Sequence, residues 1–353
     1  MKLEKVRSQM EQLNIDGMLI TNEYNRRYLT GFTGTAGVAL VAKEDACFIT
    51  DFRYVEQSKK QVKHFRIVQH SGSIFEEVAT QAKKMGIKTL GFEQDHLSYS
   101  TYTSYKDVLK GIEFVPVSNI VEKLRLIKTD EEIKILKEAA EIVDAAFTHI
   151  LHMIRPGVRE IELANELEFF MRKKGAASSS FDTIVASGYR SALPHGVASE
   201  KPIEKGELVT FDFGAYYKGY CSDMTRTIAV GDPGDEMKEI YNIVLEAQKK
   251  GVREIKSGMT GREADAVTRT YIEDKGYGEY FGHSTGHGIG LEIHEGPTLS
   301  ARSDTVLQPG MVVTVEPGIY LPGKGGVRIE DDILITEHGN EVLTHSKKEL
   351  IIL

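Results

Sequence analysis

Apolar and polar positions along the first 120 residues follow two alternating patterns. Apolar residues recur at helical spacing in residues 3–13 and 74–85, which predicts amphipathic helices there. Short continuous apolar runs, typical of buried strands, occupy residues 17–20, 38–42, 46–50, 89–92 and 114–117. Helices alternating with such strands predict a small α/β domain at the start of the chain.

A long helix is predicted to open the second part of the chain. Thr129 and Glu132 have the spacing of a capping box, and apolar residues from Ile133 to Phe147 recur at helical spacing. The helix is expected to end near Arg155–Gly157, because proline cannot continue it. We place the domain boundary just before this helix, which gives domains of residues 1–122 and 123–353.

The second domain contains a weak internal repeat. Residues 154–175 and 255–276 have the same length, begin with Ile-x-x-Gly and end in Lys-Gly, and Glu162 matches Glu263. Each stretch follows a long amphipathic helical pattern. One interpretation is coincidence, because helix–glycine–helix sequences are common. The other is a duplicated α/β half, with a site where the two halves meet, since sites favour such junctions.

Two aspartates belong to a predicted β-hairpin formed by residues 207–213 and 224–230. A two-residue loop at 217–218 would place Asp212 directly opposite Asp223, with Cβ atoms about 4.5–5.5 Å apart. Gly219 could instead shift this register by one residue. Two facing carboxylates repel each other unless a counter-charge lies between them, although a solvent-exposed sheet edge would also tolerate them.

Three further segments present metal-ligating side chains in conspicuous settings. The glycine-rich loop Gly282–Gly290 carries two histidines, and His294 follows it closely. Glu316 ends an apolar strand and is held extended by the proline after it. Glu330 shares one face of a strand with Arg328. The resulting candidate metal ligands are Asp212, Asp223, His287, Glu316 and Glu330.

This ligand set has a recognisable chemistry. Four carboxylates and one imidazole suit hard or borderline divalent cations such as Mn²⁺ better than a structural zinc ion. Because one ion rarely needs four carboxylates, we expect two ions that share bridging carboxylates, about 3.5–4 Å apart. Such a pair activates a bridging water and polarises a carbonyl group.

Composition excludes several other classes of protein. The 353 residues suggest two domains. The net charge of −8 argues against a nucleic-acid partner, and no apolar run approaches the ~18 residues that a membrane span needs. Two cysteines cannot form a disulfide framework. The charged, amphipathic start lacks the apolar core of a secretion signal, so we expect a cytoplasmic protein.

At these residues the chain resembles the creatinase/prolidase/aminopeptidase P family of metallopeptidases. The specific histidine motif of that family matches HSTGHGIGLEIHE at 283–295. The remaining motifs appear in the expected order, as DFG (212–214), SDMTRT (222–227), VEPG (315–318) and RIED (328–331). Residues 25–32 and 50–54 look like the N-terminal domain of the family, so the resemblance covers the whole chain.

The resemblance implies a fold and a role for each ligand. It implies an α/β (α+β) protein, with a small creatinase-like N-terminal domain before a "pita-bread" peptidase domain of pseudo-twofold halves. Asp212 would chelate one ion, while Asp223 and Glu330 would bridge both. His287 and Glu316 would complete the other ion, and Glu316 would also act as the proton shuttle.

The resemblance also implies residues that contact the substrate. His195, in Leu193–Gly196, matches a family histidine that touches the substrate beside the metals. His283 and His294 match two histidines that stabilise the tetrahedral intermediate and hold the substrate. Arg328 fits an arginine near the proline side of the substrate, and Tyr320 is expected to line that pocket.

The activity implied is dinuclear-metal-dependent hydrolysis of Xaa-Pro bonds in small peptides, with Mn²⁺ favoured and Co²⁺ or Zn²⁺ also compatible. The compact chain favours an Xaa-Pro dipeptidase (prolidase), and the alternative is an Xaa-Pro aminopeptidase. A homodimer is expected from the family. Methionine aminopeptidase shares the metal ligands but lacks the extra N-terminal domain. A creatinase-like hydrolase and a non-catalytic binding relative are further alternatives, and five intact ligands argue against both.

Overall fold

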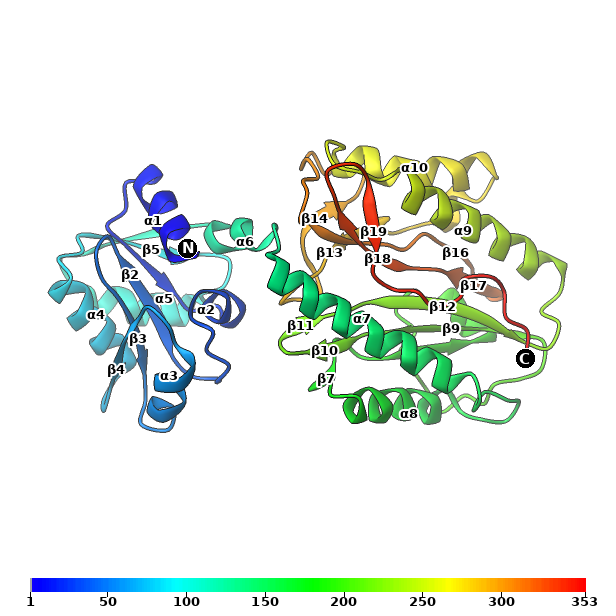
Figure 1. Ribbon diagram of the computed structural model, residues 1–353, viewed down its shortest axis with the longest axis horizontal. Helices are drawn as coiled ribbons and strands as arrows, with labels where there is room; N and C mark the ends of the chain where they lie inside the picture. The colour runs from blue at the N-terminus through cyan, green and yellow to red at the C-terminus, as the bar shows by residue number, and fades with distance from the viewer. Residues whose placement is uncertain (1) are drawn as a thin grey trace. The chain divides into compact units, whose positions relative to one another are not determined.

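The computed structural model describes residues 2–353 and divides into two compact units, Met1–Arg125 and Leu126–Leu353 (Figure 1). The first unit contains one six-stranded sheet in the order β4-β3-β2-β1-β5-β6. Its strands are β1 (Gly17–Ile20), β2 (Val38–Ala42), β3 (Ala46–Thr50), β4 (Arg66–Gln69), β5 (Thr89–Glu93) and β6 (Glu113–Val117). Its helices are α1 (Lys2–Gln12), α2 (Glu23–Thr30), α3 (Val55–Gln61), α4 (Ile74–Lys84), α5 (Tyr99–Val108) and α6 (Ile120–Arg125).

The central strands of this sheet carry the predicted apolar runs. Every residue of β1, β2 and β3 is buried, as expected for strands covered on both faces. Val78 and Ala82 of α4 join the same core as Leu19 and Leu40. The pattern did not predict α2, α3, β4, α5 or α6. β4 is half-exposed and α5 has a single buried residue, so neither presents a recognisable apolar period.

The second unit contains four long helices, two short 3₁₀ helices and the remaining strands. The helices are α7 (Asp130–Ile150), α8 (Glu160–Lys173), α9 (Asp235–Glu254) and α10 (Gly261–Asp274), with η1 (Gly188–Ala192) and η2 (Gly278–Tyr280). The strands of its first half are β7 (Ser178–Ser179), β8 (Ile184–Ser187), β9 (Glu207–Phe213), β10 (Ala215–Tyr217), β11 (Tyr220–Cys221) and β12 (Met224–Val230). The second half contains β13 (Gly286–Gly288), β14 (Glu295–Leu299), β15 (Val312–Val315), β16 (Gly318–Leu321), β17 (Gly325–Arg328), β18 (Asp331–Ile335) and β19 (Asn340–Val342).

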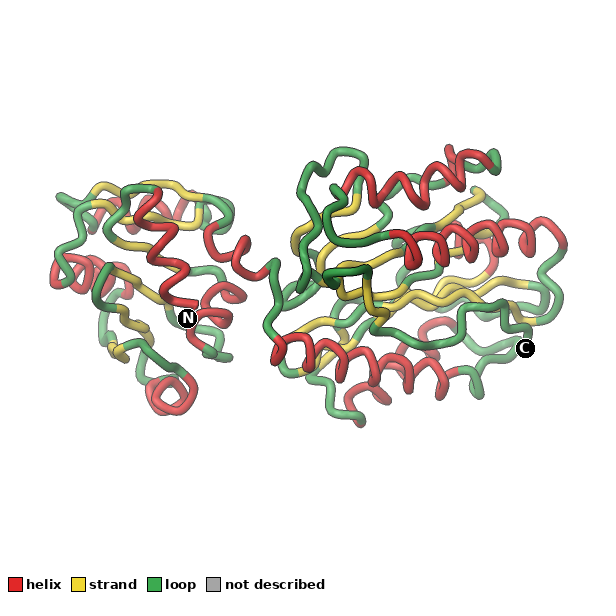
Figure 2. Tube along the Cα trace, turned by 45° about the horizontal axis from the view of Figure 1, so that its top comes forward, coloured by secondary structure: helices red, strands yellow, loops and turns green. Residues whose placement is uncertain are grey.

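The two halves of this unit repeat one arrangement. A helix pair precedes three antiparallel strands in each half, β8-β9-β12 in the first and β13-β15-β18 in the second, with β9 and β15 central. The helix pairs lie on the outside and the strands between them (Figures 1 and 2). Glu162 and Glu263 each accept the backbone N–H of the residue before their helix, at 2.9 and 2.7 Å. The sequence repeat therefore reflects a repeated structural unit.

Helix α7 begins where the capping box predicts. The Thr129 N–H donates to Glu132 Oε2 at 2.8 Å, and the Glu132 N–H donates to Thr129 Oγ1 at 3.4 Å. The helix ends at Ile150, and a turn at residues 151–153 separates it from the predicted Arg155–Gly157 stop, so proline marks only the outer limit. Neither α7 nor any other helix within residues 2–353 combines the length and apolarity needed to cross a membrane.

The predicted hairpin forms with a different register. Asp212 lies opposite Thr225, not Asp223, and Asp223 directly precedes β12. The turn uses Lys218 and Gly219, which both have positive φ (49° and 90°), as the tight turns that suit strand twist require. This moves the turn one residue beyond the predicted loop. Asp223 thus becomes a diagonal rather than a direct neighbour of Asp212.

Candidate metal centre and active site

A cavity of about 770 Å³ opens within the second unit, where the strand ends of both halves converge. Its apolar wall is formed by Phe181, Ile184, Pro194, Val197 and Ile293. Its polar wall contains nine of the ten predicted site residues, namely His195, Asp212, Asp223, His283, His287, His294, Glu316, Arg328 and Glu330. The tenth, Tyr320, is buried and is joined to this wall by hydrogen bonds to His283 and Arg328.

The two halves contribute their carboxylates from corresponding places. Asp212 lies at the end of the central strand β9, and Asp223 directly precedes β12. Glu316 directly follows the central strand β15, and Glu330 directly precedes β18. His287 lies in the middle of β13. Because the paired strands are antiparallel, each half brings two carboxylates to the same end of its sheet.

Three of these carboxylates each keep one oxygen atom without a protein donor. Arg328 Nη2 donates to Asp212 Oδ2 at 2.6 Å, and the Thr225 hydroxyl donates to Glu330 Oε2 at 2.6 Å. Within residues 2–353, no hydrogen-bond partner reaches the buried atoms Asp212 Oδ1, Asp223 Oδ1 and Glu330 Oε1. Buried carboxylate oxygens without donors are costly unless a cation pairs with them. They fit a divalent metal ion.

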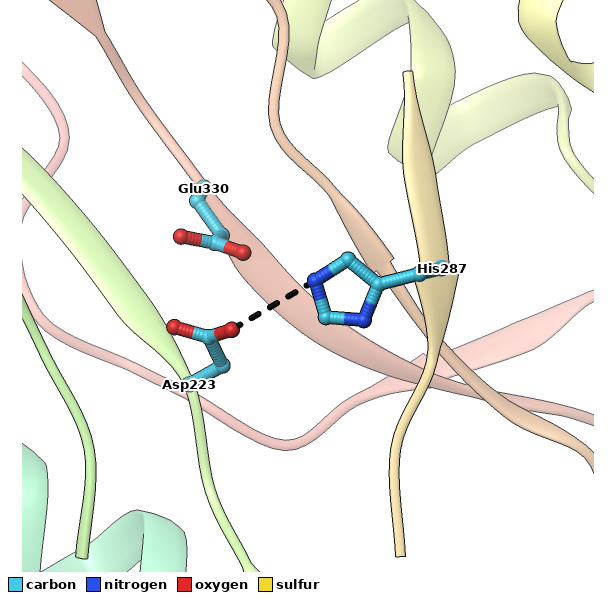
Figure 3. A group of neighbouring side chains, drawn as sticks. All are labelled: Asp223, His287 and Glu330. Carbon is cyan, nitrogen blue, oxygen red and sulfur yellow. Dashed lines mark ion pairs between the residues drawn. The ribbon is translucent and has the colours of Figure 1, made fainter. Parts of the chain in front are cut away.

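His287 directs one ring nitrogen toward the carboxylate of Asp223, beside Glu330 (Figure 3). Its Nδ1 lies 3.1 Å from the carbonyl oxygen of Gly288, which can only accept, so the proton is on Nδ1 and Nε2 faces the carboxylates. Nε2 lies 3.7 Å from Asp223 Oδ2 and 3.4 Å from Glu316 Oε1. Burial lowers the pKa of His287 to about 4, which keeps the ring neutral. Ligand atoms of Asp223, His287 and Glu330 lie within 4.8 Å of one another.

The electrostatics of the cluster also favour cation binding. Burial raises the pKa of Asp223 well above its usual range, and the charges of Glu330 and Asp212 raise it further. Burial likewise raises the pKa of Glu330, with Glu316 and Asp212 adding to the effect. Burial raises the pKa of Glu316 to about 8, although Arg328 opposes the shift. Positive charge entering the cavity would oppose these shifts and favour the ionised form of Asp223, Glu316 and Glu330.

Metal-stripped protein is expected to lose thermal stability as pH rises from 6.5 to 8. The folded-state pKa of Glu316, about 8, lies above the unfolded value of 4.5, so its stabilising contribution is present at low pH and is lost as pH rises through about 8. Over 1.5 pH units the loss is about 2 kcal/mol. His283 and His287, with pKa values lowered from 6.5 to about 4, act mainly below pH 6.5, and the stability that they still add above it, about 0.8 kcal/mol together, is smaller than this loss.

Thermal unfolding at pH 6.5 and 8, with excess Mn²⁺ or with a chelator, measures this effect. The chelated protein is expected to show the larger fall in melting temperature, because bound cations keep the carboxylates ionised in the folded state. Equal falls in the two samples would contradict the prediction.

A hydrogen-bonded chain connects Arg328 to His283 through Tyr320. Arg328 Nη1 donates to the Tyr320 hydroxyl at 2.7 Å, and that hydroxyl lies 2.8 Å from His283 Nε2. His283 Nδ1 lies 2.8 Å from the carbonyl oxygen of Ser284, so Nδ1 donates there and Nε2 accepts from Tyr320. Arg269 of α10 holds the backbone carbonyl of His283 at 2.7 Å. The chain fixes the tautomer and orientation of His283.

His195 and His294 occupy the more open part of the cavity. Both side chains are exposed, and the His294 ring lies edge-on to the His287 ring, with centroids 4.4 Å apart. They are therefore accessible to a ligand in the cavity, beside the carboxylates.

Thr225 is a polar residue of this region that the sequence patterns did not single out. Thr225 donates to Glu330 and accepts a hydrogen bond from Arg328 Nε at 3.1 Å, so it joins two motifs that lie about a hundred residues apart. Its place in the SDMTRT segment, two residues after Asp223, was the available signal, because alternate strand residues share a face.

Several solved structures resemble the whole chain. A Xaa-Pro dipeptidase from Bacillus anthracis is 71% identical, with a TM-score of 0.99 over 100% of this chain and 99% of that one. A prolidase from Pyrococcus horikoshii is 44% identical, with a TM-score of 0.95 over 99% of each chain. An X-Pro aminopeptidase from Thermotoga maritima is 42% identical, with a TM-score of 0.91 over 98% of this chain and all of that one.

The family matches agree with the fold and with the resemblance found in the sequence. Residues 2–127 match the creatinase/prolidase N-terminal domain, and residues 134–337 match metallopeptidase family M24. The second match covers more than half of the chain and contains every candidate metal ligand. The protein is therefore a member of metallopeptidase family M24, in which a creatinase-type N-terminal domain is followed along the chain by a pita-bread peptidase domain.

Proposed function

We propose that this protein is an Xaa-Pro dipeptidase, which hydrolyses the bond between an N-terminal residue and a C-terminal proline. The observation that carries the proposal is the convergence of four carboxylates and a neutral imidazole on one cavity with an apolar wall. The 71% identity to a Xaa-Pro dipeptidase supports the dipeptidase over the aminopeptidase activity. The 42% identity to an X-Pro aminopeptidase keeps that activity as the alternative.

Two divalent ions are proposed to bind in this cavity, held by Asp212, Asp223, His287, Glu316 and Glu330. The oxygen-rich set, with three buried oxygen atoms left unpaired among residues 2–353, supports a hard or borderline ion, and Mn²⁺ is the proposed one. When bound, such ions supply Lewis acidity toward the scissile carbonyl and lower the pKa of the attacking water.

Glu316 is proposed to move the proton. Its carboxylate accepts a proton from the attacking water and donates it to the proline nitrogen as the C–N bond breaks, which leaves a free amino acid and proline. Its position supports this role, because Oε1 receives the Thr314 hydroxyl at 3.1 Å and Oε2 lies 4.0 Å from His283 Nδ1. One oxygen of Glu316 is thus fixed by a hydrogen bond, and Glu316 and His283 both line the cavity.

The remaining residues are proposed to hold the substrate. His195, at the open side, contacts the peptide beside the metal ligands, and His294 together with His283 is proposed, as the family resemblance implies, to stabilise the tetrahedral intermediate and hold the substrate. Arg328 and Tyr320 meet the proline side, and Arg328 also fixes the carboxylate of Asp212. Proline offers no amide hydrogen, so the apolar wall is proposed to select its ring by shape.

Hydrolysis of Ala-Pro and Ala-Pro-Ala by metal-stripped enzyme, with and without added Mn²⁺, tests the proposal. We expect Mn²⁺-dependent cleavage of the dipeptide and little release of alanine from the tripeptide. Asp223→Ala should be inactive on both, because it removes a proposed bridging ligand. Preferential cleavage of the tripeptide would make the enzyme an aminopeptidase. Cleavage of neither by wild-type protein would favour a creatinase-like or non-catalytic role.

The cellular compartment and the oligomeric state of the enzyme are also proposed. Cys47 and Cys221 are both buried and unpaired, which supports a reducing compartment such as the cytoplasm. The family resemblance supports a homodimer, and light scattering coupled to size exclusion measures its mass.

A further inference from the structure

Glu160 is a fully buried carboxylate that the proposed chemistry does not use. It is the first residue of α8, its exposed fraction is 0%, and it does not line the cavity. A buried carboxylate is costly unless several donors surround it. The donors around Glu160 therefore indicate what it stabilises.

Every hydrogen bond that the Glu160 carboxylate accepts comes from one loop, with donors at both ends of it, whereas the Glu160 backbone N–H donates to the carbonyl of Lys201 just beyond the loop. At the first end, Ser187 donates to Oε1 through its backbone N–H and its hydroxyl, both at 2.8 Å. At the other end, Ser199 donates to Oε2 through its backbone N–H at 3.1 Å and its hydroxyl at 2.6 Å. Arg190, between the two ends, also donates to Oε2.

The loop enclosed by these contacts forms one side of the cavity. It leaves β8 at Ser187 and passes through η1 before returning at Ser199, and Pro194, His195 and Val197 line the cavity from it. Arg190 connects the carboxylate to the far part of this loop, because its Nη2 donates to the Val197 carbonyl at 2.9 Å. The His195 side chain is exposed, so its position depends on the backbone that carries it.

We propose that Glu160 is a positioning residue for His195. Its carboxylate closes the loop 187–199 at both ends and, through Arg190, fixes the backbone beside the histidine. A carboxylate suits this task because it accepts several hydrogen bonds at once and strengthens each one by its charge. The catalytic consequence rests on the proposed function, whereas the attachment of the loop does not.

Hydrogen exchange of the full-length protein, measured by mass spectrometry, tests the attachment. In Glu160→Gln, peptides covering residues 187–199 are expected to exchange at least about 10-fold faster, while β13 keeps the wild-type rate. Glu162→Gln is the matched control, because Glu162 lies in the same helix turn but is exposed and bonds Arg159 instead. Unchanged exchange in 187–199 would overturn the proposal.

A double-mutant cycle in kcat/KM tests whether Glu160 acts through His195. Glu160→Gln is expected to lower kcat/KM for Ala-Pro by about 10- to 100-fold with full metal content, because small misplacements of contact groups cost this much. The His195→Ala and Glu160→Gln/His195→Ala proteins should agree within about twofold. If the losses of kcat/KM in the two single variants multiply in the double variant, or if the loss in Glu160→Gln follows a loss of bound metal, the positioning role would be overturned.

Two further outcomes remain decisive. If Glu160→Gln does not fold, Ser199→Ala serves as the second variant, because it removes one donor and leaves the carboxylate. Residues 187–199 are then expected to exchange faster than in wild type but more slowly than a loop that has lost all of its hydrogen bonds to Glu160. If wild-type protein cleaves no Xaa-Pro peptide, the proposed function fails, whereas the exchange measurement still decides whether Glu160 holds the loop.

Discussion

Glu316→Gln is expected to lower kcat for Ala-Pro by about 10³-fold. The amide keeps the size of the side chain but cannot accept the proton of the attacking water. It also removes one of the carboxylates that compensate bound cations. Burial raises the pKa of Glu316 to about 8 in the metal-free protein, and bound cations would lower it, which leaves an ionised carboxylate able to accept a proton.

Steady-state kinetics at saturating Mn²⁺, with the metal content of the same sample measured, separate the two effects. A fully loaded but inactive variant would assign the loss to proton transfer, and an unloaded variant would assign it to the metal site. Glu337→Gln, an exposed carboxylate after β18, should leave kcat unchanged. A Glu316→Gln enzyme within tenfold of wild type would refute the proposed role.

Arg226→Met is expected to destabilise the folded protein by about 3 kcal/mol, because it leaves Lys348 as the remaining cation beside buried Asp331 and removes the donor to nearby backbone carbonyls. Arg226 on β12 and Asp331 on β18 form an ion pair at 2.7 Å, with exposed fractions of 1% and 0%. Arg226 also donates to the backbone carbonyls of Glu330 and Ser346. The pair joins the two halves directly beside a proposed metal ligand, so metal affinity should fall together with stability.

Urea unfolding, with metal titration of the folded fraction, measures both effects. Arg262→Met provides the comparison, because its ion pair with Asp304 is mostly exposed and surface changes usually remain within about 0.5 kcal/mol. A loss of stability in Arg226→Met no larger than that of the control would show that the halves do not depend on this pair.

The repeat and the hairpin illustrate how far sequence patterns reach. Apolar patterns predicted α7 and the central strands of the first unit, because burial on one face of a helix leaves a period in the sequence and burial on both faces of a strand leaves a continuous apolar run. The register of β9 on β12 was missed, because period-2 alternation specifies the face of a side chain and the turn specifies its partner. A turn displaced by one residue replaced Asp223 with Thr225 opposite Asp212.

The sequence by itself predicted α7, the central strands of the first unit and the set of candidate ligands, because these depend on local patterns and short motifs, and it left the duplication as one of two interpretations. Tertiary structure alone decided which oxygens of that set are already bonded, through Arg328 and Thr225, and which remain unpaired. It also brought Glu160 within hydrogen-bond distance of both ends of the loop 187–199. Such contacts join residues far apart in the chain, and hydrogen-bond geometry between them exists only after the halves have packed.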